Sequence, residues 1–278
     1  MSRIRAVTFD AGQTLIELST ELLSQRLAER GVRLTARSLD AAAPAAWQGY
    51  ASCLARGQTG EAAWKHFMST LLGSADRAPS TPAAMGDSER ATDAASITEL
   101  CDWLWSEQPR RNLWRRPVPG MIDLARELGA RDIPVAIISN SEGKLAELFA
   151  ELGQADAFRV IADSGVLGFE KPGPEIFEWT AAKLGVDTKQ LLHVGDSYEA
   201  DVRGALGVGA AAVWFNPAGF SATAAAWTGP ASCAVGGFEP VDAAPTSSHR
   251  APISSRPSIR RACTAFELRE HLVDLGLV

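Results

Sequence analysis

The sequence is short of the features that mark several classes of protein. Its four cysteines, Cys53, Cys101, Cys233 and Cys263, are far apart and show no CxxC spacing, which indicates neither a zinc site nor a disulfide framework. The formal net charge of −6 and the pI of about 5.3 argue against a nucleic-acid partner held by a basic field. The longest apolar stretch, near residues 205–215, is too short and too glycine-rich to cross a bilayer.

The beginning of the sequence has little that indicates targeting. MSRIRAVTFD runs directly into a strand-like segment, from which we expect no signal peptide. With 278 residues, 46% of them hydrophobic, the chain is long enough for one large domain or two modest ones. We therefore expect a cytoplasmic protein, a monomer or a homodimer, with neither a membrane nor a nucleic acid as its partner.

Hydrophobic patterning from Pro117 to Phe215 alternates between short apolar runs and longer amphipathic segments. IPVAIIS, FRVIA, LLHVGD and AAAVWF have the composition of buried strands. PGMIDLARELGARD, EGKLAELFAELG, GPEIFEWTAAKLG and YEADVRGALGVG have a helical period. Gly153, Gly185 and Gly207 stand where helices are expected to stop. This order predicts βαβ units and a parallel sheet, to which RAVTFD and the segment SIRRAC each add a strand. A helix is predicted in the segment that follows SIRRAC, TAFELREHLVDLGL.

Residues 17–116 have a different pattern. Four segments have helical periodicity and none looks like a strand: STELLSQRLAERG, RSLDAAAPAAWQGYASCLA, GEAAWKHFMSTLLG and SITELCDWLWSEQ. We predict an all-helical domain inserted into an α/β domain made of residues 1–16 and 117–278. Two stretches rich in Ala, Ser and Pro, residues 74–96 and 218–256, are expected to be long loops with partial disorder.

Polar groups follow the predicted strands. Asp10 comes after AVTF, Ser139 after PVAII, Lys171 lies in GFEKPGPEIF, and HVGDSYEAD contributes Asp196 and Asp201. Because the carboxyl ends of parallel strands meet at one crevice, these residues can converge. Carboxylates suit Mg²⁺, which prefers hard oxygen ligands, and a cation with a hydroxyl suits a phosphoryl group, whose spread charge needs positive groups and donors.

Taken in order, these segments resemble the four motifs of the haloacid dehalogenase (HAD) superfamily of hydrolases. FDAGQTL is similar to the first motif, IISN to the second, EKPGPEIF to the third and GDSYEAD to the fourth. The helical block between the first two motifs resembles the family's first (C1) type of cap domain. The resemblance implies an α/β fold, with a Rossmann-like core around a parallel sheet and an inserted all-helical cap.

The resemblance also implies a role for each motif residue. Asp10 would be the nucleophile that forms an aspartyl-phosphate, and Lys171 would pair with Asp10 and with the phosphate. Ser139 would donate to a phosphate oxygen, and Thr14 and Asn140 complete the implied substrate-binding set. The implied activity is that of a phosphatase, of the EC 3.1.3 type, acting on a small phosphorylated metabolite.

The implied cofactor is Mg²⁺. The resemblance places it on Asp10, on the backbone carbonyl of Gly12 and on Asp196, with Asp201 bound directly or through water. Asp196 and Asp201 are five residues apart, and the turn after the strand can hold both near one ion.

Position 12 departs from the family's pattern. Most family phosphatases have a second Asp there, which protonates the leaving oxygen and later activates water, whereas this chain has Gly12 followed by Gln13. Proton transfer of this kind is typically worth ~10²–10⁴-fold in rate. We therefore predict slow turnover of alkyl phosphates unless water, Gln13 or a cap residue takes over the role.

Alternative functions stay open. Gly12 and Gln13 are compatible with a weakly active or inactive HAD-fold module that binds a partner or a ligand. The phosphonate-cleaving branch has a small residue at position 12 and a cap lysine that forms a Schiff base, and the cap block here contains one lysine, Lys65. Dehalogenases also lack the second Asp, but they would have no use for Asp196 and Asp201 together.

Other notable residues are expected to be structural. His193 lies inside an apolar strand, where we predict a hydrogen-bonded core residue. The tryptophans of the helical block are predicted to pack helices together, with one or two at most lining a substrate pocket: Trp47, Trp64, Trp103 and Trp105.

Overall fold

The computed structural model describes residues 3–58, 60–76, 94–216 and 259–278. Contacts divide these residues into two compact units, which we describe separately. The first unit includes the described residues up to Glu17, those from Trp114 to 216 and those from 259 onward, and the second includes those from Leu18 to Leu113.

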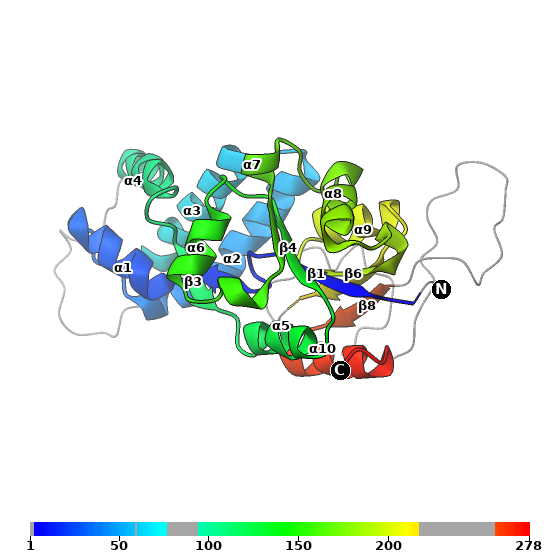
Figure 1. Ribbon diagram of the computed structural model, residues 1–278. Helices are drawn as coiled ribbons and strands as arrows, with labels where there is room; N and C mark the ends of the chain where they lie inside the picture. Colours follow the sequence, from blue (N-terminus) through cyan, green and yellow to red (C-terminus); the bar gives the residue numbers. More distant parts are fainter. Residues whose placement is uncertain (1–2, 59, 77–93, 217–258) are drawn as a thin grey trace. The chain divides into compact units, whose positions relative to one another are not determined.

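The first unit is built on a six-stranded parallel sheet with the order β5-β4-β1-β6-β7-β8 (Figure 1). The central strands β1, β4 and β6 are buried along their whole length because helices cover both faces. Each predicted strand is confirmed. The strands are β1 (Ala6–Phe9), β4 (Val135–Ser139), β5 (Val160–Asp163), β6 (Leu191–Gly195), β7 (Ala211–Phe215) and β8 (Ile259–Ala262).

Helices lie on both sides of this sheet. α5 and α10 lie side by side on one face, and α8 and α9 lie on the other (Figure 1). The predicted helices are confirmed, and the structure adds the short α7. The bounds are α5 (Met121–Ala130), α6 (Leu145–Glu151), α7 (Ser164–Leu167), α8 (Pro174–Leu184), α9 (Gly204–Gly207) and α10 (Ala265–Asp274).

Two of the predicted helix stops have the expected left-handed backbone. Gly153 has a φ of 67° after α6 and Gly185 a φ of 72° after α8, a conformation that costs glycine nothing. Gly207 is instead the last residue of α9, and the left-handed residue beyond that helix is Gly209, with a φ of 78°.

A second sheet has two short strands. β2 (Ile16–Leu18) pairs with β3 (Trp114–Pro117), and Nε of Arg116 donates to Oε1 of Glu17 at 2.8 Å. These strands were not predicted, because each is too short for a periodic pattern. The pairing places the chain from Trp114 onward with the first unit, so the contacts give the helical unit bounds of 18–113 where the sequence suggests 17–116.

The second unit consists of helices in its described residues beyond Leu18. They are α1 (Thr20–Glu29), α2 (Ala36–Ala55), α3 (Gly60–Asp76) and α4 (Ala94–Glu107). The tryptophans pack between these helices, as predicted. The contacts are Trp47 with Phe67 (ring centroids 4.3 Å apart), Trp64 with Trp105 (5.3 Å) and the guanidinium of Arg30 with Trp103 (4.5 Å).

The two predicted loops fall largely outside the described residues. Residues 218–256 are not among them, and neither are residues 77–93. At the ends of the first range the prediction is wrong, since residues 74–76 close α3 and residues 94–96 open α4. The helical period simply continues into the Ala- and Ser-rich composition at both ends.

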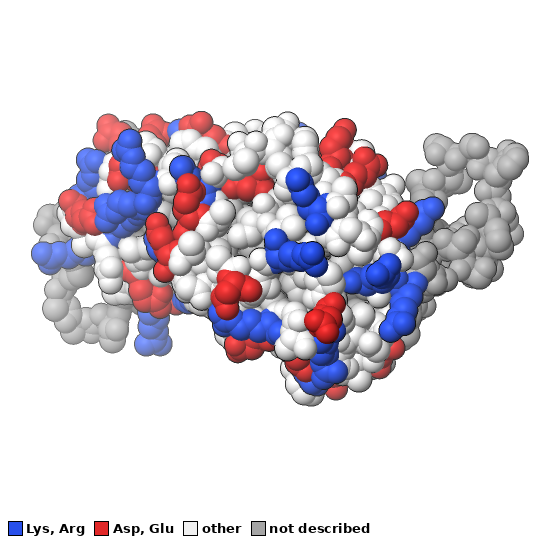
Figure 2. Space-filling model, viewed as in Figure 1, with Lys and Arg blue, Asp and Glu red and all other residues white. Residues whose placement is uncertain are grey.

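The surface carries charges of both signs. On the face seen in Figure 2, basic and acidic side chains are interspersed over the described residues. Several form ion pairs between elements of the first unit, such as Arg269 with Glu127 and Arg126 with Asp156. Among the described helices, none is both long enough and apolar enough to cross a membrane.

Candidate active site

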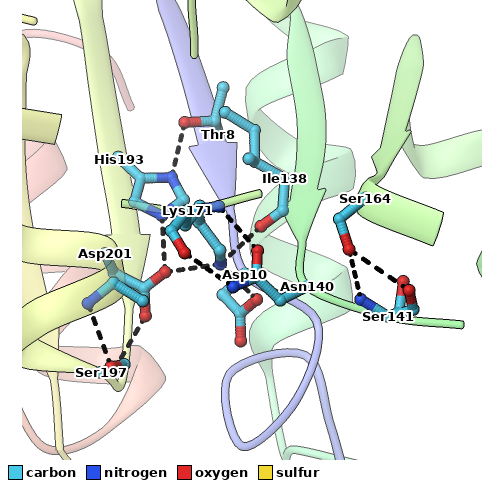
Figure 3. A network of polar contacts seen from close by, with 11 residues as sticks. Thr8, Asp10, Ile138, Asn140, Ser141, Ser164, Lys171, His193, Ser197 and Asp201 are labelled. Atoms are coloured by element: carbon cyan, nitrogen blue, oxygen red, sulfur yellow. Dashed lines mark hydrogen bonds and ion pairs between the residues drawn. The ribbon is translucent and has the colours of Figure 1, made fainter. Parts of the chain in front are cut away.

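Asp10 and Lys171 meet at the carboxyl edge of the sheet. Asp10 directly follows β1, and its N–H donates to the carbonyl of Val194 at 2.8 Å. Lys171 lies in the loop before α8, and its Nζ donates to Oδ1 of Asp10 at 2.6 Å, to Oδ1 of Asp201 at 2.6 Å and to the carbonyl of Ile138 at 2.8 Å (Figure 3). All three protons of the ammonium group are therefore used, and the lysine bridges two carboxylates.

Asp196 lies just before the π-helical turn η4 (Tyr198–Arg203) that follows β6, and Asp201 lies within it. Ser197 caps this turn, and its N–H donates to Oδ2 of Asp201 at 2.8 Å (Figure 3). Gly195 permits the approach, because a Cβ there would overlap the Asp201 carboxyl group. Oxygens of Asp10, Asp196 and Asp201 all lie within 4.8 Å of one another, so three carboxylates gather around one point.

The buried charges shift one another's pKa. Burial raises the pKa of Asp10, although Lys171 opposes this, and burial together with the charges of Asp10 and Asp201 raises the pKa of Asp196 well above its ordinary value. Burial also works against ionised Asp201, but the charge of Lys171 and the hydrogen bonds to Lys171 and His193 lower its pKa overall. Desolvation opposes the charge on Lys171, yet the two carboxylates raise its pKa. Asp196 is thus the carboxyl group with the most to gain from a bound cation.

His193 supports Asp201 from behind. It is fully buried on β6, with Nδ1 at 2.9 Å from Oγ1 of Thr8 and Nε2 at 3.1 Å from Oδ1 of Asp201 (Figure 3). Burial lowers the pKa of His193, which favours the neutral ring. The tautomer that satisfies both contacts has Nε2–H donating to Asp201 and the Thr8 hydroxyl donating to Nδ1.

The prediction of a hydrogen-bonded core histidine is confirmed, but neither of its partners, Thr8 and Asp201, was predicted. One signal was available in the sheet register, where Thr8 of β1 stands opposite His193 of β6. Side chains alternate along a strand, so Thr8 shares a face with Asp10. Only the fold of the turn after β6, however, brings Asp201 back over His193.

Asn140 joins two of the motif segments. Its Nδ2 donates to the carbonyl of Lys171 at 2.8 Å, and its Oδ1 accepts from the N–H of Lys171 at 2.8 Å (Figure 3). The carboxamide of Asn140 is therefore engaged with the main chain of Lys171 and fixes the lysine beside β4. Ser139, the last residue of β4, is buried next to it.

Asp163 is a second residue that the sequence analysis did not single out. It ends β5, is buried, and accepts hydrogen bonds from the N–H groups of Gly143, Leu145 and Gly165, each at 3.0 Å. These bonds hold the turn that follows Asn140. Its place at a strand end, like that of Asp10, was the one signal in the sequence.

The loop after Asp10 has few side-chain contacts. Gln13 has a left-handed backbone with a φ of 56°, and its N–H donates to the carbonyl of Ile16 at 2.7 Å. Within the described part of the chain, Nε2 of Gln13 and Oγ1 of Thr14 are buried without a hydrogen-bond partner. A Cβ built on Gly12 would lie 3.9 Å from Oδ2 of Asp10, so position 12 faces Asp10.

Lys65, in the helical unit, lies between two acids. Its Nζ is 2.5 Å from Oε1 of Glu61 and 2.6 Å from Oδ1 of Asp102. The hydrogen bonds to Asp102 and Glu61 raise the pKa of Lys65. A lysine that forms a Schiff base has to be neutral when it attacks, which needs a lowered pKa, so this environment works against such a role.

A family model described as haloacid dehalogenase-like hydrolase matches residues 4–209. The chain belongs to this family of hydrolases. Two relatives are "Haloacid dehalogenase-like hydrolase domain-containing protein 3" of Homo sapiens, 28% identical over 117 residues, and "Phosphoserine phosphatase" of Thermus thermophilus, 31% identical over 119 residues. Each match covers 42% of this chain and 46% of the relative, so the similarity spans less than half of either protein.

Solved structures of HAD proteins share the fold. The HAD-hydrolase YfnB from Bacillus subtilis, solved with bound magnesium, is 19% identical and has a TM-score of 0.59, with 98% of this chain and 99% of that chain covered. A structural match at this level of identity supports the α/β core with its helical insertion, and it supports the fold alone.

Proposed function

We propose that this HAD hydrolase is a Mg²⁺-dependent phosphatase of a small phosphorylated metabolite, with Asp10 as its nucleophile. The observation that carries the proposal is the contact of one buried ammonium group, Lys171 Nζ, with both Asp10 and Asp201 at 2.6 Å. A relative named phosphoserine phosphatase and a magnesium-bound structural neighbour add support.

Asp10 is suited to attack phosphorus. Lys171 occupies its Oδ1, and Oδ2 faces the open position at Gly12. In the proposed reaction an Asp10 oxygen attacks the phosphorus atom and the bond to the leaving oxygen breaks, which gives an aspartyl-phosphate. Water then attacks the phosphorus, the bond to Asp10 breaks, and the carboxylate is restored. Ser139 and the main-chain N–H groups near Asn140 would bind phosphate oxygens, with Thr14 beside them.

The cluster of three carboxylates fits a hard divalent cation. Asp10, Asp196 and Asp201 offer oxygens within 4.8 Å of one another. Burial, together with the charges of Asp10 and Asp201 that Lys171 does not fully offset, raises the pKa of Asp196. Asp10 and Asp196 would hold Mg²⁺ with the carbonyl of Gly12, and Asp201, already bonded to three donors, would act directly or through water. When bound, the ion supplies positive charge to the transferring phosphoryl group.

A phosphate-release assay tests the proposal. Purified protein is incubated with a broad panel of phosphomonoesters and activated aryl phosphates, with Mg²⁺ or with EDTA. We expect release only with Mg²⁺, and none from Asp10→Asn. Release by Asp10→Asn at the wild-type rate would exclude Asp10 as the nucleophile.

The matched control is Asp156→Asn. Asp156 is an exposed acid of the same unit, paired with Arg126 on the surface, and its substitution should leave the rate unchanged. Circular dichroism of both variants separates loss of chemistry from loss of fold.

A non-catalytic HAD module is the second candidate, and Gly12 is the observation that favours it. Inactivity of the wild-type protein and of Gly12→Asp against the whole panel, with both folded, would support a binding role. C–P bond cleavage through Lys65 is disfavoured by its two ion pairs.

A further inference from the structure

Position 12 lies next to Oδ2 of Asp10, whereas Lys171 donates to Oδ1. A Cβ built on Gly12 would lie 3.9 Å from Oδ2 of Asp10 and 3.9 Å from Cδ1 and Nε1 of Trp114, all ordinary van der Waals distances. The backbone of Gly12 also does not have a positive φ, so it is open to residues other than glycine. A Cβ therefore fits here, and a side chain that begins at this point would lie beside Asp10 and any phosphoryl group carried on it. The chain places only a hydrogen atom at this point.

The side chains around Gly12 cannot supply a proton in its place. Gln13 has a carboxamide, Thr14 a hydroxyl and Trp114 an indole N–H, and these groups form hydrogen bonds without ionising near neutral pH. Each can stabilise charge on an oxygen atom. None can act as a general acid or as a general base there.

The ionisable groups that act on Asp10 are already engaged elsewhere. They are Lys171, Asp201 and His193, with Asp196 as a further neighbour. The two carboxylates hold the proton on Lys171, and Asp201 accepts from Lys171, His193 and the N–H of Ser197. These groups neutralise the phosphoryl group or hold the metal side of the site, and the atoms nearest a Cβ built at position 12 belong to Asp10 and Trp114 instead.

From this one-sided site we infer a substrate class: phosphoryl donors whose leaving oxygen departs without a proton, namely acyl phosphates, phosphoanhydrides and aryl or enol phosphates. The inference rests on the proposed function and deepens it. When Asp10 attacks, the electron pair of the broken P–O bond moves to the leaving oxygen. A carboxylate, with a conjugate-acid pKa of about 4, holds this pair readily, a phenolate at about 10 less well, and an alkoxide poorly unless it is protonated in the same step.

The second half of the reaction is affected as well. The aspartyl-phosphate is itself an acyl phosphate, so its carboxylate leaves readily, but no base stands at position 12 to activate the attacking water. The water has to attack unaided, and its proton passes to the phosphate product. The aspartyl-phosphate should therefore accumulate during turnover with good substrates. All such substrates would then share one kcat, and their differences would appear in kcat/KM.

The experiment is a leaving-group series measured as kcat/KM with Mg²⁺. It comprises acetyl phosphate, a set of substituted phenyl phosphates and an alkyl phosphate such as glycerol phosphate. We expect kcat/KM to fall steeply as the pKa of the leaving group rises. For the alkyl phosphate, kcat/KM should be ~10²–10⁴-fold lower than if a general acid protonated its leaving oxygen. A burst of product with acetyl phosphate, and acid-stable trapping of phosphate on wild-type protein but not on Asp10→Asn, should accompany it.

Gly12→Asp and Gly12→Asn form the matched pair. Both add a side chain of the same size, and only Asp can transfer a proton. Gly12→Asp should raise kcat/KM for the alkyl phosphate by ~10²-fold or more and flatten the series, whereas Gly12→Asn should leave the slope steep. Thermal unfolding of each variant shows whether the side chain is accommodated.

The outcomes separate the two levels of the proposal. If wild-type protein releases phosphate in an Asp10-dependent manner but turns over alkyl and aryl phosphates equally well, the substrate class is wrong and an acid from elsewhere serves the site. If neither acetyl phosphate nor the most activated aryl phosphate is cleaved, the proposed function falls, and the substrate class with it.

Discussion

The two sides of Asp10 differ in how completely their polar groups are paired. On the lysine side, Lys171, Asp201, His193 and Thr8 form a buried chain of hydrogen bonds in which each side chain has a partner. On the loop side, Gly12 has no side chain, and Nε2 of Gln13 and Oγ1 of Thr14 are buried without a partner within the described chain. The difference separates two tasks: the lysine side is built to neutralise charge, and the loop side is not built to transfer a proton.

Removal of the lysine should have the largest effect. Lys171→Met leaves Asp10 and Asp201 buried next to each other without their shared cation, and breaking a buried ion pair in this way costs about 3–5 kcal/mol. We expect urea unfolding to show a loss of this size and phosphate release to disappear. Lys183→Met, an exposed lysine on α8, is the control and should change stability by less than about 1 kcal/mol. Equal stability of the two variants would mean that the lysine side is not the paired side.

The metal site should respond to pH in a defined direction. Asp196 has a pKa in the folded protein above its unfolded value, so the folded state without metal binds the proton more tightly. The protonated Asp196 carboxyl group therefore contributes to the stability of the metal-free protein at low pH, and this contribution is lost as the pH rises through the raised pKa. Mg²⁺ needs the ionised carboxylates, so its stabilising effect should grow over the same rise in pH.

Thermal unfolding with and without Mg²⁺ between about pH 5 and pH 8 measures this effect. At 100 times the dissociation constant, Mg²⁺ should stabilise the protein by about 2.7 kcal/mol on the alkaline side and by clearly less on the acid side. Asp196→Asn should remove most of the Mg²⁺ effect at every pH. The same stabilisation by Mg²⁺ at both ends of the range would contradict the assignment of Asp196 as a ligand.

The hydrogen bond from His193 comes next in size. His193→Leu removes a donor from the buried Asp201 carboxylate, and hydrogen bonds to charged groups are worth about 1.5–3 kcal/mol. His193→Gln keeps an N–H that can reach Asp201 and should recover part of the loss in urea unfolding. If the Gln variant were no more stable than the Leu variant, packing rather than the bond to Asp201 would explain the histidine.

The fold could be predicted further than the site. The strands around Asp10 could be predicted because each is a short apolar run, and the helices between them could be predicted because they show a full amphipathic period. β2 and β3 could not be read, since three or four residues give no period and their pairing joins distant parts of the chain. The π-helical form of η4 was equally hidden, because it depends on how Ser197 and Asp201 bond within the turn.

In the site, the residue types could be predicted from the sequence, whereas most of their hydrogen-bond partners could not. Asp10, Lys171, Asp196 and Asp201 could be predicted to converge because parallel strands end at one edge. That Asn140 would bind the main chain of Lys171 could not, because this contact depends on the path of two loops. The metal-ligand roles and the contacts of Ser139 and Thr14 with phosphate stay predictions.

The smallest effect concerns Gln13, and it examines the loop side directly. Gln13 has a φ of 56° and a buried Nε2 without a partner in the described chain. A left-handed backbone costs an L residue about 1–2 kcal/mol, and an unpaired buried donor costs about 1–3 kcal/mol. Gln13→Gly removes both costs but adds freedom to the unfolded chain and removes buried side-chain contacts. We expect a net gain of about 1 kcal/mol in urea unfolding.

A substitution of Asp132 distinguishes the effect of the left-handed backbone from the effect of the buried side chain. It is the other non-glycine residue with a positive φ, 60°, in the described chain, and it is exposed in the turn between α5 and β4, at the edge of the sheet opposite Asp10. Asp132→Gly also relieves a left-handed backbone and adds freedom to the unfolded chain, but it removes no buried amide. Its gain in the free energy of unfolding should therefore be smaller than that of Gln13→Gly. A loss of stability in Gln13→Gly alone would mean that the amide has a partner, such as a bound water molecule, and that the loop side is paired after all. A gain in stability together with a fall in phosphate release would mean that the strained glutamine is kept for its contact with the reacting groups.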